Sequence, residues 1–479
     1  MTSISTAKRG RYSPASDWTD SKRYAWILGL VVPMLPPISI LLNHITGISA
    51  LLWLTPVVFL GVVPLIDLLA GYDDTNPPDE VIEALENDRY YRWVTYLYLP
   101  VQYAGFILAF WYLATTDLPI IARIGLAVSA GFVGGVAINT AHELGHKKES
   151  HERWFSKVAL AQSFYGHFFI EHNRGHHVRV ATPEDPASAR MGESLYRFWP
   201  RTVLGSLKSA WRLQKKRCAR KHTHPFHIGN DVLNAWLMSV VLWGGLMLWL
   251  GLAYDVNPLH VLPYLVINAF IGFSLLEVVN YMEHYGMLRQ KVGVPPRERY
   301  ERVLAAHSWN SNNIATNVLL YHLQRHSDHH ANPTRRYQTL RDFRDAPVLP
   351  TGYTGMIVVA LFPPLFWKLM DKRVAAHYDG DLRLANVAPG KFDKLVEKFP
   401  LPEVKEHELA ADVTAHDFAD DVAAARCPGC GYTYEVAAGN ELEGFAAGTA
   451  WKDIPDDWCC PDCGVREKVD FIPLTSISA

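Results

Sequence analysis

The sequence has almost no net charge, few cysteines and no glycine-rich dinucleotide motif. Lys and Arg number 46 against 48 Asp and Glu, a formal net charge of −2, so the basic excess of a typical nucleic-acid-binding protein is missing and no nucleic-acid partner is expected. Five of the six cysteines lie within residues 427–463, which indicates a metal site rather than a disulfide framework. Without a Gly-rich fingerprint, any nicotinamide cofactor is expected to bind another protein.

Long apolar segments are abundant, by contrast. Hydrophobic residues make up 49% of the chain, and six segments are long enough to cross a hydrocarbon layer of about 30 Å as helices of about 20 residues. Six repeats of this length favour a mainly α fold, a six-transmembrane-helix bundle, over a large soluble helical core. The predicted spans are residues 24–42, 50–70, 94–114, 120–141, 232–252 and 259–281.

The distribution of Lys and Arg predicts the orientation of this bundle. The N-terminal tail, residues 1–23, contains five of these residues, whereas the short loops at 43–49, 115–119 and 253–258 contain none. The long segment after residue 142 is again rich in both. Because Lys and Arg concentrate in cytoplasmic loops, we expect a multi-pass protein of the inner (cytoplasmic) membrane with both termini and the metal sites in the cytoplasm.

Histidine is concentrated in four short motifs. On a helix, residues four apart share a face, so His142 with His146, and His172 with His176, are each expected to hold one ion. Adjacent His pairs point in different directions and can reach two ions. One ion cannot take nine imidazoles, and the sequence therefore predicts two metal ions at one cytoplasmic site. The predicted ligands are His142, His146, His172, His176, His177, His284, His326, His329 and His330.

The residue types leave the metal and part of the chemistry open. Imidazole binds zinc, copper, iron and nickel. His142-Glu-Leu-Gly-His146 also matches the zincin motif with Glu143 as the base, but that reading leaves seven histidines unexplained. Acidic residues near the motifs are expected to orient the ligand N–H groups and offset charge, or alternatively to be solvent-exposed. These acids are Glu143, Glu171, Asp185, Glu283 and Asp328.

Two C-x-x-C pairs near the C-terminus predict a four-thiolate site for structural zinc or a single iron. The words Cys-Pro-Gly-Cys-Gly-Tyr at 427–432, Ile-Pro-Asp-Asp-Trp at 454–458 and Cys-Pro-Asp-Cys-Gly at 460–464 resemble rubredoxin. The resemblance covers roughly residues 426–473 and implies a small irregular and β domain that transfers single electrons. A zinc ribbon is the alternative. The iron ligands that the resemblance implies are Cys427, Cys430, Cys460 and Cys463, with Cys459 as a non-ligand.

Charge separates this C-terminal part from the rest. Residues 401–479 contain 16 acidic and five basic side chains, which leaves a net charge of +9 on the remainder. An acidic domain is electrostatically steered toward a basic surface, although acidity also serves solubility alone. The predicted organisation is a membrane domain at 24–400, an acidic flexible linker at 401–425 and the rubredoxin domain at 426–479.

The order of the histidine motifs resembles the membrane di-iron hydroxylases and desaturases. Asn280-Tyr-Met-Glu-His-Tyr-Gly286 narrows the resemblance to the alkane 1-monooxygenase and xylene-monooxygenase branch. The words at 142–147, 171–177 and 323–330 look like the alkane branch, and the resemblance covers roughly residues 20–385. It implies two His-bound irons that use O₂ to hydroxylate medium-chain n-alkanes at the terminal carbon. Electrons would come from NAD(P)H through a separate rubredoxin reductase and the fused rubredoxin, which is a departure from the commoner separate arrangement.

The lipid bilayer is expected to supply the alkane to a channel between the helices. Trp53 and Phe59 are candidates for its lining, with lipid contact or helix packing as the alternative. Other possible functions are a fatty-acyl desaturase or lipid hydroxylase and a xylene-type methyl hydroxylase of the same superfamily. A metal transporter with a zinc ribbon is a further alternative, which predicts ionisable residues at the midplane of the spans.

Overall fold

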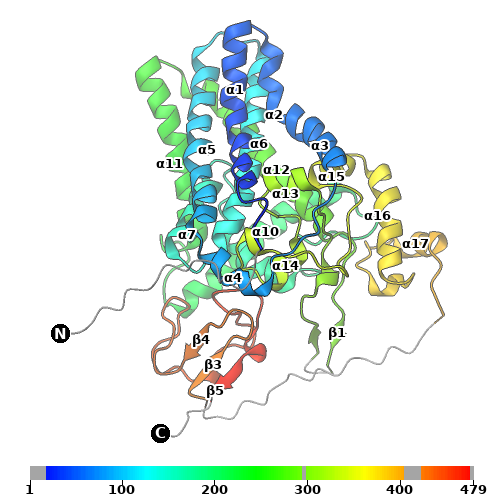
Figure 1. Ribbon diagram of the computed structural model, residues 1–479. Helices are drawn as coiled ribbons and strands as arrows, with labels where there is room; N and C mark the ends of the chain where they lie inside the picture. The colour runs from blue at the N-terminus through cyan, green and yellow to red at the C-terminus, as the bar shows by residue number, and fades with distance from the viewer. Residues whose placement is uncertain (1–17, 294–297, 404–421, 475–479) are drawn as a thin grey trace.

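The computed structural model describes residues 18–293, 298–403 and 422–474. Long helices run side by side in one bundle, and a small module containing β3, β4 and β5 lies at one end of it (Figure 1). Most of the predicted linker, and the first 17 residues of the predicted tail, lie outside the described residues. The predicted fold class is confirmed: a mainly helical membrane bundle joined to a small β-containing module.

Six helical segments in the described part of the chain are long and apolar enough to cross a membrane, as the sequence predicts. They are Ala25–Thr46, Ser49–Ala70, Arg89–Thr115, Ile120–Gly145, Asp231–Tyr254 and Pro258–Glu283. The third to sixth are the labelled helices α5, α6, α11 and α12, while the first comprises η1 (Ala25–Leu30) and α1 (Val31–Thr46). The second comprises η2 (Ser49–Trp53), α2 (Leu54–Val57), η3 (Val58–Val62) and α3 (Val63–Ala70).

The second span is interrupted by a π-helical turn, η3. Pro64 is the second residue after this turn and has no N–H to donate, so a break in the regular hydrogen bonding is expected here. Such π-turns occur preferentially at functional sites. Phe59, a predicted channel residue, lies in this turn and is buried.

Helix α6 is the central helix of the bundle, since 67% of its most apolar window is buried against 22% for the second span. Glycines allow α12 to approach it closely. A Cβ on Gly131 would lie 2.8 Å from the carbonyl oxygen of Asn268, and one on Gly135 would lie 2.8 Å from Leu275. Small residues permit this kind of helix contact in membranes. The close packing places the C-terminal ends of α6 and α12 together.

The remaining elements lie between and after the spans, and several of them cover that end of the bundle. The helices are α4 (Asp79–Asn87), α7 (Ser150–Ala161), α8 (Phe168–Glu171), the π-helical η4 (His172–His176), α9 (His177–Arg179), α10 (Leu195–Arg220), α13 (Ile314–Leu319), α14 (His326–Ala331), α15 (Tyr353–Ala360), α16 (Pro363–His377) and α17 (Phe392–Lys398). Strands β1 (Lys291–Val292) and β2 (Arg299–Tyr300) form an antiparallel pair. The 3₁₀ turns are η5 (Ala305–His307), η6 (Tyr337–Thr339) and η7 (Leu382–Leu384).

We call residues 422–474 the cysteine module. Its antiparallel sheet has the order β4-β3-β5, formed by Thr433–Glu435, Ala424–Arg426 and Ile472–Leu474. Two further 3₁₀ turns are η8 (Trp451–Asp453) and η9 (Lys468–Asp470). Buried aromatic side chains form most of its core, which large apolar rings stabilise efficiently in a small domain. They are Tyr434, Phe445, Trp451, Trp458 and Phe471.

Candidate metal centre

All nine histidines of the four motifs are buried and lie together at the end of the bundle. They form two groups, and within each group one ring nitrogen per residue lies within 4.8 Å of all the others. The first histidine group is His142, His146, His172, His177 and His329. The second histidine group is His176, His284, His326 and His330.

Four separate elements position these side chains. His142 lies in the last turn of α6 and His146 directly follows it. His284 follows the last residue of α12, and α14 begins with His326. The close contact of α6 with α12 therefore brings two of the motifs together, and η4 with α14 supplies the other two.

The π-helical turn η4 changes one predicted pairing. Residues 172 and 176 would share a face of a regular α-helix, but here they lie in a π-helical turn, in which the N–H of His177 donates to the carbonyl of His172 five residues earlier. His172 consequently joins His177 in the first group and His176 faces the second, so the expected pairing of His172 with His176 is wrong. The adjacent pairs, 176 with 177 and 329 with 330, are divided between the groups as expected from their divergent directions.

The ring nitrogens of both groups have the environment that metal ligands need. The Nε2 atoms of His142, His146 and His176 are buried and have no hydrogen-bond partner among the described residues. Buried polar atoms are normally paired. In the first group Nε2 of His177 lies 3.0 Å from that of His172, and in the second Nε2 of His330 lies 2.9 Å from that of His326. These converging donors fit two metal ions.

Burial also favours the neutral imidazole that binds metals. Burial first, and then the neighbouring imidazoles, hold the pKa of His172, His326 and His329 well below the usual value. Burial likewise lowers the pKa of His284 to about 3. Deprotonated imidazoles bind metal without first releasing a proton, so the donor set is prepared at neutral pH.

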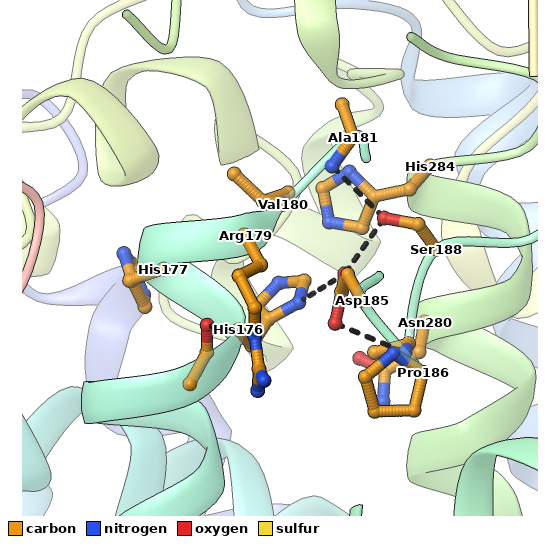
Figure 2. Close-up of polar contacts among 12 residues, drawn as sticks. His176, His177, Arg179, Val180, Ala181, Asp185, Pro186, Ser188, Asn280 and His284 are labelled. Atoms are coloured by element: carbon orange, nitrogen blue, oxygen red, sulfur yellow. Dashed lines mark hydrogen bonds and ion pairs between the residues drawn. The ribbon is translucent and has the colours of Figure 1, made fainter. Parts of the chain in front are cut away.

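Asp185 orients one of these ligands (Figure 2). Its Oδ2 accepts a hydrogen bond of 2.9 Å from Nδ1 of His176 and one of 2.7 Å from Oγ of Ser188, while the backbone N–H of Ala187 donates to Oδ1 at 3.1 Å. The hydroxyl of Ser188 accepts in turn from the backbone N–H of Ala181. Burial alone would raise the pKa of Asp185, but the charge and hydrogen bond of His176 lower it to about 2. An ionised Asp185 keeps the proton of His176 on Nδ1 and leaves Nε2 for a metal.

The other four candidate acids lie in different surroundings. Oε2 of Glu283 lies 3.3 Å from Nε2 of His326, on the metal side of that ring. Glu143 pairs with Lys147 at 3.0 Å, and Glu171 pairs with Arg179 at 2.8 Å. Asp328 pairs with Arg335 and accepts from the backbone N–H of Arg341. The last three acids therefore balance nearby cations, whereas Glu283 faces the second histidine group.

An apolar cavity adjoins both histidine groups. Phe59 lines it, and its ring packs edge-to-face against the ring of Phe132, with 5.9 Å between the ring centroids. Trp53 is not among the lining residues; its indole N–H donates to the carbonyl of Ile121 at 3.1 Å. The lining includes Val136, Asn139, His142, Phe168, His172, Leu275, Val279, Glu283, His326 and Ile357. The cavity therefore borders ligand candidates of both histidine groups.

The cysteine module presents a four-sulfur site. One Sγ from each of Cys427, Cys430, Cys460 and Cys463 lies within 4.8 Å of the other three, and Cys459 is not part of this cluster. A glycine follows each C-x-x-C pair, and its N–H donates to the carbonyl of the first cysteine. The distance is 3.0 Å from Gly431 to Cys427 and 2.9 Å from Gly464 to Cys460. Four thiolates from two such turns fit one tetrahedral iron or zinc.

Ion pairs hold the cysteine module against the bundle. Arg174 binds Oε1 of the buried Glu443 at 2.7 Å, and Nε of Arg220 donates to the Glu443 carbonyl at 2.9 Å. Lys216 binds Asp457 at 2.8 Å, and Arg302 binds Asp470 at 2.9 Å. The opposite net charges of the two parts predict such a contact, but no sequence pattern identifies the individual residues.

The two kinds of site face each other across this interface. A polar cavity between module and bundle is lined by His146 and Lys147 on one side and by Cys460 and Cys463 on the other. Nζ of Lys148 donates to the carbonyl of Cys430 at 3.0 Å. The cysteine cluster is thus turned toward the first histidine group rather than toward solvent.

Comparison with known proteins agrees with this arrangement. Residues 119–360 match the Fatty acid desaturase family and residues 424–471 match the Rubredoxin family. Alkane 1-monooxygenase 1 of Alcanivorax borkumensis is 46% identical over 382 residues, which cover 80% of this chain and 92% of the relative. An alkane 1-monooxygenase of Pseudomonas putida is 43% identical over 398 residues, 83% of this chain and 95% of the relative.

The bundle, the histidine groups and the match over residues 119–360 define a multi-pass membrane protein of the fatty acid desaturase class. A more distant relative is the hydroxylase component of a xylene/toluene monooxygenase of Pseudomonas putida, 26% identical over 260 residues, which cover 53% of this chain and 65% of the relative. The identities of 46% and 43% over most of both chains are decisive. The chain belongs to the alkane 1-monooxygenase family and has a rubredoxin module at its C-terminal end.

Proposed function

We propose that the chain hydroxylates the terminal carbon of medium-chain n-alkanes, using O₂ and two electrons delivered through its own rubredoxin module. The single observation that supports this most is the apolar cavity that adjoins both histidine groups, next to a docked four-cysteine site. The names of the relatives agree with an alkane substrate. A terminal C–H bond is inert toward ordinary side-chain acids, bases and nucleophiles, so bound iron would supply the O₂ activation.

The side chains of the bundle hold and orient the reacting parts. Two irons would be bound by the nine histidines, five in the first group and four in the second. Asp185 fixes the tautomer of His176. The apolar lining excludes water and aligns a saturated chain whose only feature is its shape, and Phe59 borders the space in which the chain lies. Glu283 places a carboxylate between this cavity and His326.

The cysteine module acts as the electron donor in this proposal. Cys427, Cys430, Cys460 and Cys463 would hold a single iron. Such an iron would supply one electron at a time, so the module would act twice per alcohol formed. A separate NAD(P)H-dependent rubredoxin reductase would reload it. The predicted linker, residues 401–425, overlaps strand β3 (Ala424–Arg426) of the cysteine module, so the tether to the membrane domain at 24–400 would end before residue 422. Tethering raises the local donor concentration.

The same proposal places both metal sites at the cytoplasmic face of the inner membrane. The basic segment after α6 contains Arg174, Arg217 and Arg220, and it meets the cysteine module at the end of the bundle. Cytoplasmic Lys and Arg set this orientation. An alkane dissolved in the bilayer would then enter between the helices, while reductant arrives from the cytoplasm.

A second candidate function is a fatty-acyl desaturase or lipid hydroxylase. The match of residues 119–360 to the Fatty acid desaturase family is the observation that favours it. A xylene-type methyl hydroxylase is a weaker candidate, because that relative covers only 53% of the chain at 26% identity. Both alternatives use the same histidine groups and differ in the occupant of the cavity.

Product analysis distinguishes these functions. Membranes containing the full chain receive NADH, a rubredoxin reductase, ¹⁸O₂ and a mixture of n-alkanes, xylenes and acyl lipids, and mass spectrometry identifies the products. A ¹⁸O-labelled primary alcohol from an alkane is the expected result. Unsaturated or hydroxylated acyl chains with the alkanes unchanged would instead establish the second candidate and refute the first. Membranes with a His329→Ala variant are the control for background oxidation.

A further inference from the structure

One glycine of the cysteine module is in unusually close contact with the bundle. Gly464 directly follows Cys463 and has a φ of +69°, and its N–H donates to the carbonyl of Cys460 at 2.9 Å. A Cβ at this position would lie 2.2 Å from the carbonyl oxygen of Asn173. Such a separation is far below van der Waals contact, so only glycine permits the two backbones to meet here.

The bundle residue in this contact is a sequence neighbour of the metal-ligand candidates. Asn173 lies in the π-helical turn η4, directly after His172 of the first histidine group and three residues before His176 of the second. On the other side of the contact, Gly464 is bonded to Cys463 of the four-sulfur site. The contact therefore joins backbone segments that are adjacent to metal-ligand candidates on both sides.

Neighbouring ion pairs fix the geometry of this contact. Arg174, the residue after Asn173, binds Glu443 at 2.7 Å, and Arg220 binds the backbone of the same glutamate. Lys148 holds the Cys430 carbonyl in the other cysteine turn. Charge-assisted hydrogen bonds of this kind give geometric specificity.

We propose that the contact between Gly464 and the Asn173 carbonyl is the electron-transfer junction, and that Gly464 is the positioning residue that sets its distance. The inference rests on the proposed function. In each transfer one electron leaves the ferrous iron of the cysteine site, which becomes ferric, and reduces one ferric histidine-bound iron to ferrous. NAD(P)H is the ultimate donor through the reductase, and no covalent bond forms or breaks at the junction.

Two glycine variants of the full-length chain separate the contact from backbone strain. Gly464→Ala introduces the Cβ that meets Asn173. Gly448→Ala is the matched control, because Gly448 has a φ of +86° in the same module and a Cβ there would meet nothing within 4 Å. In both variants an alanine must adopt the left-handed backbone conformation of the glycine, which strains it equally. Only Gly464→Ala also pushes the module away from the bundle.

The transfer is followed by stopped-flow absorbance of the cysteine-bound iron, after reduced protein is mixed with O₂ and an alkane. We expect Gly464→Ala to reoxidise this iron several-fold more slowly, because the rate of electron transfer falls as the two metal sites move apart. Gly448→Ala should react at the unmodified rate. Reduction by the reductase, and the visible spectrum of the iron, should be unchanged in both variants.

Docking is measured independently of iron by carbodiimide cross-linking of Lys216 to Asp457, which form an exposed ion pair of 2.8 Å. Mass spectrometry should find less of this amide in Gly464→Ala than in Gly448→Ala. Slower transfer with an unchanged cross-link also supports the junction, because the module is then docked but displaced. Equal transfer rates in Gly464→Ala and the unmodified chain, or equal slowing in both variants, would overturn the inference.

Failure of the proposed function has a different signature. In that case the unmodified chain and a His329→Ala variant would reoxidise the cysteine-bound iron at the same rate. That result would refute the proposed function rather than the junction, because it would show that the histidine centre does not accept the electrons.

Discussion

The histidine centre and the cysteine site solve the same task, holding metal, in opposite ways. The cysteine site uses two local turns, Cys427 to Cys430 and Cys460 to Cys463, in a small module with its own aromatic core. The histidine centre collects side chains from α6, η4, α14 and the end of α12, over residues 142–330. A local site depends on a short sequence, whereas the distributed one depends on the packing of the whole bundle.

This difference predicts different effects when one ligand of each site is substituted. Loss of one thiolate should affect mainly the module, because all four cysteines lie in its two turns and it has its own aromatic core. Loss of one imidazole leaves eight buried polar rings without their common partner, and buried polar atoms that lose a partner are costly. A cysteine change should therefore leave the histidine centre intact, whereas a histidine change should disturb both histidine groups.

The largest expected effect tests this asymmetry directly. Cys460→Ser should abolish NADH-driven hydroxylation by the fused module, while iron in the histidine centre and activity with an added separate rubredoxin are retained. His329→Ala should abolish activity with either donor. Iron content per chain and alcohol yield are the measurements. Full NADH-driven activity of Cys460→Ser without added rubredoxin would contradict direct transfer from this module.

A smaller effect is expected from the acid that orients a histidine. Asp185→Asn removes the charge that keeps the proton of His176 on Nδ1, and loss of such a partner typically costs about 10-fold to 100-fold in metal affinity or activity. Iron retention during chelator titration measures it. Glu193→Gln is a matched control, because Glu193 is a buried carboxylate whose partner is Arg201. Equal iron loss in both variants would argue for a structural role of Asp185.

The sequence predicts membership of the two sites better than it predicts their geometry. The six spans and the four-cysteine cluster follow from apolar length and local spacing, which need no tertiary information. The pairing of His172 with His176 was wrong because helical spacing alone does not reveal the π-turn η4. Among the acids, Asp185 contacts a candidate ligand while Glu143 pairs with Lys147, a distinction that depends on loops folding back from distant parts of the chain.

The docking interface connects the two sites, and its buried ion pair should matter more than its exposed one. Glu443→Gln leaves Arg174 and Arg220 without a carboxylate, and removing one partner of a buried charge pair typically costs about 2 kcal/mol or more. Lys216→Met should have little effect, since exposed ion pairs contribute about 0–1 kcal/mol. The rate of electron transfer within the chain is the measurement, taken over a range of salt concentrations.

Glu443→Gln should transfer electrons more slowly at every salt concentration, with the deficit increasing as salt screens the remaining pairs. Lys216→Met should follow the unmodified chain. A salt-independent rate in the unmodified chain would show that ionic contacts do not hold the module in place, and the two sites would then be coupled by packing alone.

The smallest expected effect concerns the cavity, where the distributed site gains its selectivity. Phe59→Ala would remove a ring from the lining, and each additional CH₂ buried there contributes about 0.8 kcal/mol. The preferred alkane should therefore become longer by one or more carbons, with a change of a few-fold in relative rate for each carbon.

Trp53→Leu is the control for this cavity prediction, because Trp53 contacts the Ile121 carbonyl and is not among the lining residues. Competition between alkanes of different length, with product alcohols quantified together, measures the preference free of differences in enzyme amount. An unchanged preference in Phe59→Ala would place the substrate elsewhere in the bundle. A shift in Trp53→Leu as large as that in Phe59→Ala would show that length is read along the whole second span, and selectivity would then be as distributed as the metal centre itself.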